Sequence, residues 1–320
     1  DQPRSRGLGD VYKRQELLGP CIYSTTRKIK LNKVITTNDF ISKLEDGMTI
    51  GIGGWGARRK PMSLVREICR SNLKDLTLVS YGGPDIGLLS SCKKISKLIF
   101  GFVSLDLIPL DSHFRNARQS GELPEVVEID EGMLQWGLRA AGMNLTFLPT
   151  RVGIGTDVLK NNLHIKFVES PYDDKEKLVA MPAIKLDVAL LHVNESDEKG
   201  NTLIFGPDPF FDDLFARAAS NTFVSTEKLV DSTSFDKEKV ANYNRFERNL
   251  VSGIIPDEGG AHPTACNPSY GIDLDHLKEY SKSAKTFDEY QEKYLFVDEA
   301  TYKKNVGGIK SITSIPLTKF

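Results

Sequence analysis

The sequence contains few cysteines and no arrangement of them that is typical of a metal centre or a disulfide scaffold. Cys21, Cys69, Cys92 and Cys266 are its four cysteines, and they are far apart in the sequence. None forms a Cys-x-x-Cys pair, and none has a histidine at ligand spacing. Structural zinc is therefore not expected, and the composition fits a protein of the reducing cytoplasm.

Long apolar runs and an excess of one charge are also missing. No run approaches the ~18 apolar residues that a membrane-spanning helix needs, so we expect no membrane segment. The formal net charge is −1. This balance argues against a nucleic-acid partner, which would require a basic face. With 320 residues the chain is long enough to bury a substantial core.

The first 34 residues lack the periodicity seen in the rest of the sequence. We expect residues 1–34 to be a disordered or artefactual N-terminal extension and leave them out of the fold prediction. From residue 35 to residue 320 helical and strand patterns alternate, and neither a repeat nor a low-complexity segment interrupts them. This alternation predicts one α/β domain with a mostly parallel sheet flanked by helices.

The predicted strands are short runs rich in β-branched and other apolar residues. They are Met48–Ile52, Leu76–Tyr81, Leu98–Val103, Glu125–Ile129, Leu178–Met181, Val188–Val193, Thr222–Thr226 and Leu250–Ile254. The predicted helices include 62–71, 131–142, a helix capped by Asp208 and continuing to Ala219, and two or three helices between Leu274 and Tyr302.

A glycine-rich loop follows the first of these strands. Gly53, Gly54 and Gly56 surround Trp55, and the cations Arg58–Lys60 follow before the next helix begins. A strand, a glycine loop and a helix start can direct backbone N–H groups and a helix dipole at an anion. The spacing is neither a Walker loop nor a clean dinucleotide fingerprint. The alternative is a tight turn that only closes a βα unit.

Several separated motifs, in order, resemble one known family. Gly53-Gly54-Trp55-Gly56 is followed by Tyr81-Gly82-Gly83-Pro84-Asp85, Gly101-Phe102-Val103-Ser104-Leu105-Asp106, Asp130-Glu131-Gly132-Met133-Leu134, Asp208-Pro209-Phe210-Phe211-Asp212-Asp213-Leu214-Phe215 and Gly259-Gly260-Ala261-His262. This set resembles the α subunit of class I coenzyme A transferases, and more closely the branch with the CoA-dependent ring-cleaving hydrolase of steroid (cholesterol) degradation. The resemblance implies a CoA-transferase-like fold, as in NagB and RpiA, and a CoA-transferase α-type domain over residues 35–320.

Glu131 is the candidate catalytic residue. It directly follows a predicted strand and opens a helix, so it should lie at the carboxyl end of a sheet strand, where open α/β proteins bind ligands. A carboxylate at a helix start is held ionised and is available as a base. Acidic residues are also common in first turns for stability alone, with Asp130 as the cap. The resemblance favours catalysis, since the ring-cleaving hydrolases have their catalytic carboxylate in the α subunit.

The other candidate site residues are expected to bind the acyl-CoA substrate. They are Gly53, Gly54, Trp55, Gly56, Arg58, Arg59, Lys60, Gly82, Gly83, Asp106 and His262. For His262 a hydrogen-bonded structural role is the alternative, and His192, inside a predicted strand, is interpreted as a satisfied core histidine. We expect no metal site and no cofactor other than the coenzyme A of the substrate.

Two classes of function remain open. The resemblance implies an enzyme subunit that acts on an acyl-CoA, either by hydrolytic ring opening of a cyclohexenone carboxyl-CoA or by CoA transfer between acids such as glutaconate or a 3-oxoacid. The second class is a non-catalytic binding or scaffold subunit, because fold does not fix function. The resemblance also implies a β subunit of the same family, in a heterodimer or an α2β2 heterotetramer.

Overall fold

The computed structural model describes residues 32–235 and 237–317, which fall in one compact unit. The expected N-terminal extension lies outside the described residues as far as residue 31. The N–H of Lys33 donates to the carbonyl of Glu198 at 2.7 Å, and Val34 forms a parallel bridge with Ile254. Residues 32–34 are thus attached to the sheet, and the folded part begins before the expected boundary at residue 35.

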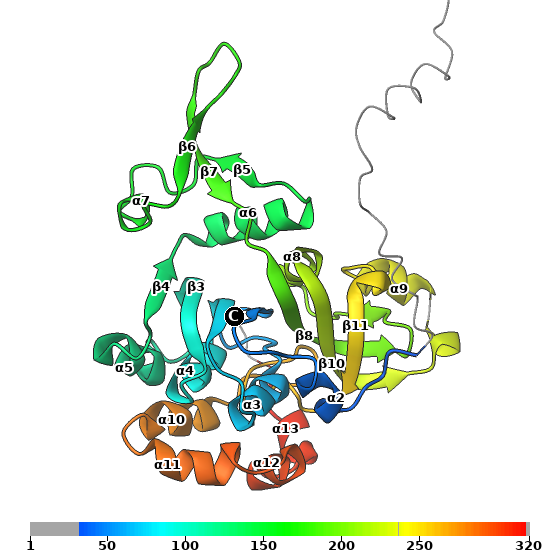
Figure 1. The fold of residues 1–320 in the computed structure, drawn as a ribbon. Helices are drawn as coiled ribbons and strands as arrows, with labels where there is room; N and C mark the ends of the chain where they lie inside the picture. The colour runs from blue at the N-terminus through cyan, green and yellow to red at the C-terminus, as the bar shows by residue number, and fades with distance from the viewer. Residues whose placement is uncertain (1–31, 236, 318–320) are drawn as a thin grey trace, which may run out of the picture. The chain divides into compact units, whose positions relative to one another are not determined.

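A parallel sheet forms the centre of the molecule (Figure 1). Its strand order is β11-β10-β8-β1-β2-β3-β4, and the short β9 pairs antiparallel to β8. The strands are β1 Thr49–Ile52, β2 Leu76–Gly82, β3 Ile95–Val103, β4 Glu125–Glu128, β8 Leu186–Asp197, β9 Thr202–Leu203, β10 Ala219–Val230 and β11 Val251–Pro256. The predicted α/β fold with a mostly parallel sheet is confirmed.

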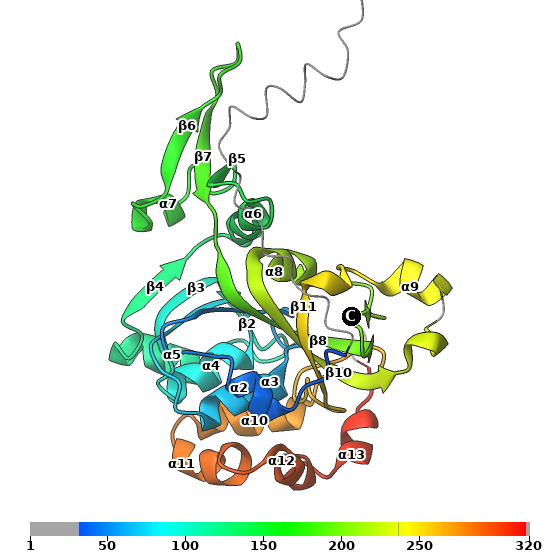
Figure 2. The same ribbon diagram turned by 45° about the vertical axis from the view of Figure 1, so that its right-hand side comes forward.

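Helices cover both faces of this sheet. Helices α3 (Met62–Arg70) and α4 (Pro84–Ser91) pack on one face, while α6 (Glu131–Gly142) and α8 (Asp212–Ala218) pack on the other (Figures 1 and 2). The C-terminal helices extend the layer of α3 and α4. The remaining helices are α2 Thr37–Ile41, α5 Ser112–Ser120, α7 Val158–Asn161, α9 Lys237–Tyr243, α10 Leu274–Ser283, α11 Phe287–Tyr290, the π-helix Gln291–Leu295, α12 Glu299–Asn305, α13 Ile309–Thr313 and the 3-10 turns Ser232–Ser234 and Arg248–Leu250.

A second, antiparallel sheet lies beyond α6. It has the strand order β5-β7-β6, with β5 Phe147–Thr150, β6 Lys166–Glu169 and β7 Lys177–Pro182. The prediction placed one strand here but neither of its partners. A short connection joins β6 to β7, and such a connection can pair two strands only antiparallel. The strand therefore belongs to a hairpin and not to the parallel sheet.

Glycine in β1 lets a helix approach the sheet closely. A Cβ atom on Gly51 would lie 2.7 Å from the Phe215 ring of α8 and 2.5 Å from Leu186. The side chains of Ile50 and Ile52, on the other face, are buried in the cluster with α3 and α4. The carboxyl end of β1 is thus held between two packed layers, and this fixes the start of the glycine loop.

Buried neutral histidines make the fold sensitive to acid. His113 lies in α5 with its Nε2 2.8 Å from the carbonyl of Tyr280 and its Nδ1 2.8 Å from the Ser91 hydroxyl. Because a carbonyl only accepts, Nε2 carries a proton. Burial lowers the pKa of His113 to about 4, and burial also lowers the pKa of His276 well below its usual value.

We expect the stability of the protein to fall as the pH drops below about 6.5. The unfolded chain takes up protons that the folded chain excludes, so stability is fully present above the unfolded pKa and is lost below it. Between pH 7 and 5.5, His113 should contribute a loss of about 1 kcal/mol. Thermal melting of His113→Gln should show a flatter pH dependence, whereas the exposed His164→Gln should keep that of the parent protein. Parallel curves for the parent and His113→Gln would contradict this account.

Candidate active site

The glycine loop at the end of β1 is a tightly packed structure. Gly54 has φ +74° and Gly56 has φ +57°, backbone conformations that favour glycine. A Cβ on Gly54 would lie 2.6 Å from the carbonyl oxygens of Arg58 and Arg59. A Cβ on Gly83 would lie 1.9 Å from the carbonyl oxygen of Gly56. The glycines therefore allow backbone to pack on backbone.

The amides of this loop are already engaged within the chain. The N–H of Gly53 donates to Leu190 O at 2.9 Å, and the N–H of Gly54 donates to the Asp212 carboxylate at 3.0 Å. The N–H groups of Trp55 and Gly56 donate to the carbonyls of Arg58 and Tyr81 at 2.9 and 3.3 Å. Each of these four amides therefore has an acceptor within the chain, and the anion that the Gly54 amide meets is the Asp212 carboxylate.

Two of the three cations after the loop are also structural. The Arg59 side chain is 3% exposed and pairs with Asp212 at 2.5 Å, and it donates to the carbonyl of His192 at 2.9 Å. Lys60 is fully buried, 3.2 Å from Asp85, and burial lowers its pKa although Asp85 opposes this shift. These contacts correct the prediction that Arg59 and Lys60 bind the substrate.

Arg58 and Asp106 form the outer side of the loop. The Arg58 side chain is 27% exposed, 3.2 Å from Asp106, and its guanidinium carbon lies 5.0 Å from the centre of the Trp55 ring. Asp106 also accepts the N–H of Ala57 at 2.9 Å. Asp106 therefore holds the loop, while Arg58 is the most exposed of the three predicted cations.

Aromatic side chains form a wall beside the loop, which we call the aromatic wall: Trp55, Phe102 and Phe210. Trp55 contacts Phe102 edge to face with ring centres 4.8 Å apart, and it is parallel to Phe210 at 6.4 Å. All three are half-buried. An apolar, partly open surface of this kind suits an apolar ligand better than a charged one.

A hollow of about 100 Å³ adjoins the aromatic wall. Its lining consists of Arg58, Arg59, Gly206, Pro207, Asp208, Phe210, Ala265 and Asn267. The backbone around it is strained. Of the eight described residues other than glycine with positive φ, four are here: Arg59, Asp106, Phe210 and Phe211. Strained conformations persist where packing holds them, and they gather at functional sites.

Glu131 lies close to the aromatic wall at the carboxyl edge of the sheet. It is the first residue of α6, and Asp130 caps that helix by accepting the N–H of Gly132 at 2.7 Å. The Tyr81 hydroxyl donates to the carbonyl of Glu131 at 3.1 Å, and a Cβ on Gly101 would lie 3.1 Å from the Glu131 Cα. Asp130 thus caps the N-terminus of α6, and the Glu131 carboxylate is not needed for this capping.

The surroundings of Glu131 raise the pKa of its carboxyl. Partial burial is the largest cause, followed by the charges of Asp130 and Asp208, while hydrogen bonds from Gln135 and Trp55 oppose the shift. The sequence alone predicted a carboxylate held ionised by the helix dipole. These surroundings raise the pKa of Glu131 above that of an ordinary glutamate, which favours a role as a general base.

The His262 side chain is not accessible to a ligand. Its ring is buried, with Nδ1 2.7 Å from the Tyr302 hydroxyl and Nε2 3.0 Å from Asp273. The prediction that it binds substrate is therefore wrong, and the alternative structural role is correct. Gly82 and Gly83 also serve packing, because a Cβ on Gly82 would lie 2.3 Å from Ile86 and Gly83 abuts the glycine loop.

Comparisons with known proteins agree with this arrangement. A family model described as coenzyme A transferase matches residues 34–244. The chain belongs to the coenzyme A transferase family. It is 45% identical over 286 residues to the cholesterol ring-cleaving hydrolase IpdA subunit of Rhodococcus jostii, covering 87% of this chain and 96% of that protein. The corresponding subunit of Mycobacterium tuberculosis is 43% identical, with 86% and 97% covered.

The fold of this coenzyme A transferase family member matches solved structures of the family. Glutaconate coenzyme A-transferase from Acidaminococcus fermentans superposes with a TM-score of 0.82 at 25% identity, covering 89% of this chain and 96% of that one. The resemblance found in the sequence is confirmed. The relatives named here as subunits are parts of larger enzymes, and none of the helices in the described ranges is long and apolar enough to span a membrane.

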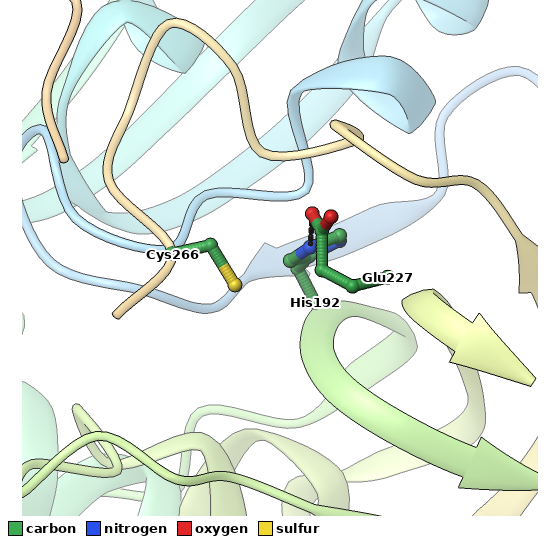
Figure 3. A group of neighbouring side chains, drawn as sticks. All are labelled: His192, Glu227 and Cys266. Carbon is green, nitrogen blue, oxygen red and sulfur yellow. Dashed lines mark hydrogen bonds and ion pairs between the residues drawn. The ribbon is translucent and has the colours of Figure 1, made fainter. Parts of the chain in front are cut away.

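A further cluster of polar side chains lies beside the glycine loop. His192, Glu227 and Cys266 approach one another in the interior (Figure 3). The His192 Nε2 lies 2.7 Å from Glu227 Oε1, a hydrogen-bond distance shorter than the roughly 3.3 Å between two ligands of a tetrahedral zinc. Tyr270 donates to the same Oε1, at 2.5 Å. His192, Glu227 and Tyr270 thus form a hydrogen-bonded network, with the His192 Nδ1 2.8 Å from the Ser225 hydroxyl, and the interpretation of His192 as a satisfied core histidine is confirmed.

The sequence analysis did not identify the residues that position the site residues from other parts of the chain. Asp212 accepts from Gly54 and pairs with Arg59, although the pattern of the sequence offered no link between them. Tyr81 and Gly101 position Glu131 from neighbouring strands. All three lie within motifs that carried the family resemblance, and this was the available signal for them.

Proposed function

We propose that this chain is the α subunit of a heteromeric enzyme that opens a ring of a cyclohexenone carboxyl-CoA from steroid degradation by hydrolytic C–C cleavage. The observation that carries the proposal is the position of Glu131, a half-buried carboxylate that opens α6 at the carboxyl edge of the sheet and lies next to the aromatic wall. The likeness to two cholesterol ring-cleaving hydrolase subunits supports the same substrate class. The enzyme would act in the cytoplasm.

The proposed reaction needs one base and one water. The ionised Glu131 takes a proton from water, and the water oxygen bonds to the β-carbon of the enone, which both the ketone and the thioester polarise. The electron pair of the C=C bond moves to the α-carbon, which takes the proton back from Glu131 and leaves an alcohol on the β-carbon. This alcohol then loses its proton to Glu131 as the neighbouring C–C bond breaks in a retro-aldol step. The electron pair of that bond forms a carbanion delocalised over two carbonyls, and protonation of this carbanion completes the uptake of one water.

The chain contributes an apolar surface and cations to acyl-CoA binding in this proposal. The aromatic wall would receive the fused rings of the acyl group, and Arg58 lies beside it. A groove of about 440 Å³ begins at Gly101 and Phe102 near Glu131 and reaches Arg115 and Arg118 of α5, which suits the phosphates of coenzyme A. Since the amides of Gly53–Gly56 are engaged internally, the proposal gives them no part in stabilising the oxyanion.

Co-expression with a β subunit of the same family tests the proposal. We expect a heterodimer or an α2β2 heterotetramer by gel filtration, and conversion of a cyclohexenone carboxyl-CoA to a product heavier by one water. Transfer of coenzyme A to a free acid without ring opening would establish the transferase alternative, which the match to glutaconate coenzyme A-transferase supports. Binding without turnover of either kind would indicate a non-catalytic subunit. An active, monodisperse single chain would disprove the need for a partner.

Removing the charge of Asp208 should change the pH profile of the enzyme. Asp208 is one of the two neighbouring charges that raise the pKa of Glu131. In Asp208→Asn the carboxyl of Glu131 ionises at lower pH, so the acid limb of kcat/KM should move to lower pH. The side-chain oxygen that accepts the N–H of Phe210 at 2.7 Å is retained in asparagine. Asp213→Asn, which makes the same change in the first turn of α8, is the matched control, and an acid limb unmoved in Asp208→Asn would contradict the coupling.

A further inference from the structure

Two cysteines that are distant in the sequence meet between helices α3 and α4. Cys69 lies in the last turn of α3, and Cys92 caps the C-terminal end of α4. The two helices pack against each other on the same face of the sheet. Their thiols are within hydrogen-bonding reach of one another, and both cysteines are free.

The two thiols differ in exposure and in charge environment. Cys69 is buried at 4% exposure, whereas Cys92 is half-buried. The hydrogen bond from Cys69 lowers the pKa of Cys92, and Lys94 and Gln291 add to this effect. Lys94 is held in place because its ammonium donates to the carbonyl of Ser71 at 2.5 Å. The same thiol contact, together with burial, raises the pKa of Cys69. The pair thus contains one half-buried cysteine whose thiol pKa is lowered, although burial opposes this shift, and one buried cysteine beside it.

We propose that Cys69 and Cys92 are a peroxide-sensitive dithiol that closes to a disulfide. In the first step the Cys92 sulfur attacks one oxygen of a hydroperoxide, the O–O bond breaks, and a sulfenic acid and water (or an alcohol) form. In the second step the Cys69 sulfur attacks the Cys92 sulfur, the S–O bond breaks, and the leaving hydroxide takes the Cys69 proton as water. The peroxide is reduced by two electrons and the two thiols are oxidised by one each.

The position of the pair gives the oxidation a structural consequence. The opposite ends of the same two helices hold the glycine loop, because α3 starts just after Lys60 and α4 contains Asp85, the partner of Lys60. A disulfide between their C-terminal ends would join the two supports of the loop. A small molecule that carries two thiols would reverse the bond by exchange.

Peptide mapping of the purified full chain tests the proposal. After brief exposure to hydrogen peroxide, a non-reduced tryptic digest should contain peptide 67–70 linked to peptide 75–93, and dithiothreitol should release both. Cys266, which is fully buried with a raised pKa, is the internal control and should react at least about tenfold more slowly. In Cys69→Ser the sulfenic acid of Cys92 should persist and be trapped by dimedone, while in Cys92→Ser the Cys69 thiol should stay reduced.

Three results would overturn the proposal. They are oxidation of Cys92 to sulfinic acid without a linked peptide, oxidation of Cys266 as fast as Cys92, and reaction of Cys69 in the Cys92→Ser variant. The wild-type mapping requires no substitution, so it decides the question even where a variant fails to fold. None of these outcomes depends on the enzymatic activity, and the test therefore stands apart from the proposed function.

Discussion

Replacement of Glu131 by glutamine should lower ring-opening turnover by about 10²–10⁴-fold while acyl-CoA still binds. Glutamine keeps the size and hydrogen-bonding capacity of the side chain but removes its charge and basicity. The capping of α6 should survive, because Asp130 and not Glu131 accepts the N–H of Gly132. Turnover, acyl-CoA affinity and melting temperature should all be measured on the same co-expressed variant.

The pattern of these three measurements separates the possible roles of Glu131. A lost turnover with unchanged affinity and melting temperature identifies the base. An unchanged ring-opening rate with a slightly lower melting temperature would assign Glu131 to the helix dipole alone. Retention of CoA transfer would point to a nucleophile outside this chain. Glu125→Gln is the matched control, since Glu125 is exposed at the opposite end of β4 and pairs only on the surface with Lys97.

Replacement of Asp212 by asparagine should destabilise the protein by about 3–5 kcal/mol. The Asp212 side chain is fully buried, and its charge is the partner of the buried Arg59 at 2.5 Å. Asparagine retains an acceptor for the N–H of Gly54 but leaves the guanidinium of Arg59 without a counter-charge in the interior. Burial raises the pKa of Asp212 while Arg59 opposes this shift, so the pair depends on both members.

Thermal and urea unfolding of four variants measure this effect: Asp212→Asn, Arg59→Met, their double variant and the control Asp213→Asn. Asp213→Asn, the neighbouring helix position and half-buried, should change stability by less than about 0.5 kcal/mol. The double variant Arg59→Met with Asp212→Asn should be less destabilised than the sum of its single changes, because no charge is then left unpaired. Additive losses would show that the pair is not coupled.

The parallel core and the position of Glu131 could be predicted because they depend on local sequence. Apolar runs of four to seven residues marked β1 and β2, and the change to helical spacing after Ile129 placed α6 at its observed bounds, Glu131–Gly142. The start of α4 was missed. Pro84 fits the first turn of a helix, where its missing N–H costs nothing, but no helix was predicted there.

The state of the glycine loop could not be predicted, because its partners come from distant parts of the sequence. The acceptor for the Gly54 amide is Asp212, 158 positions further along the chain. The second sheet was missed for a related reason, since β5 and β6 are short and become strands only by pairing with β7. A local pattern shows which residues favour a turn, but it does not show which groups will satisfy their hydrogen bonds.

The fully bonded glycine loop reverses the usual association of glycine with mobility. Four consecutive amides, from Gly53 to Gly56, are held by acceptors in β8, in α8, in β2 and in the loop itself. The loop is therefore already ordered before a ligand binds. The conformational entropy of ordering it is lost on folding and not on binding. Changes in ligand preference among such subunits should accordingly arise in the aromatic side chains around the loop. A substitution there alters the binding surface without disrupting the hydrogen bonds of the loop.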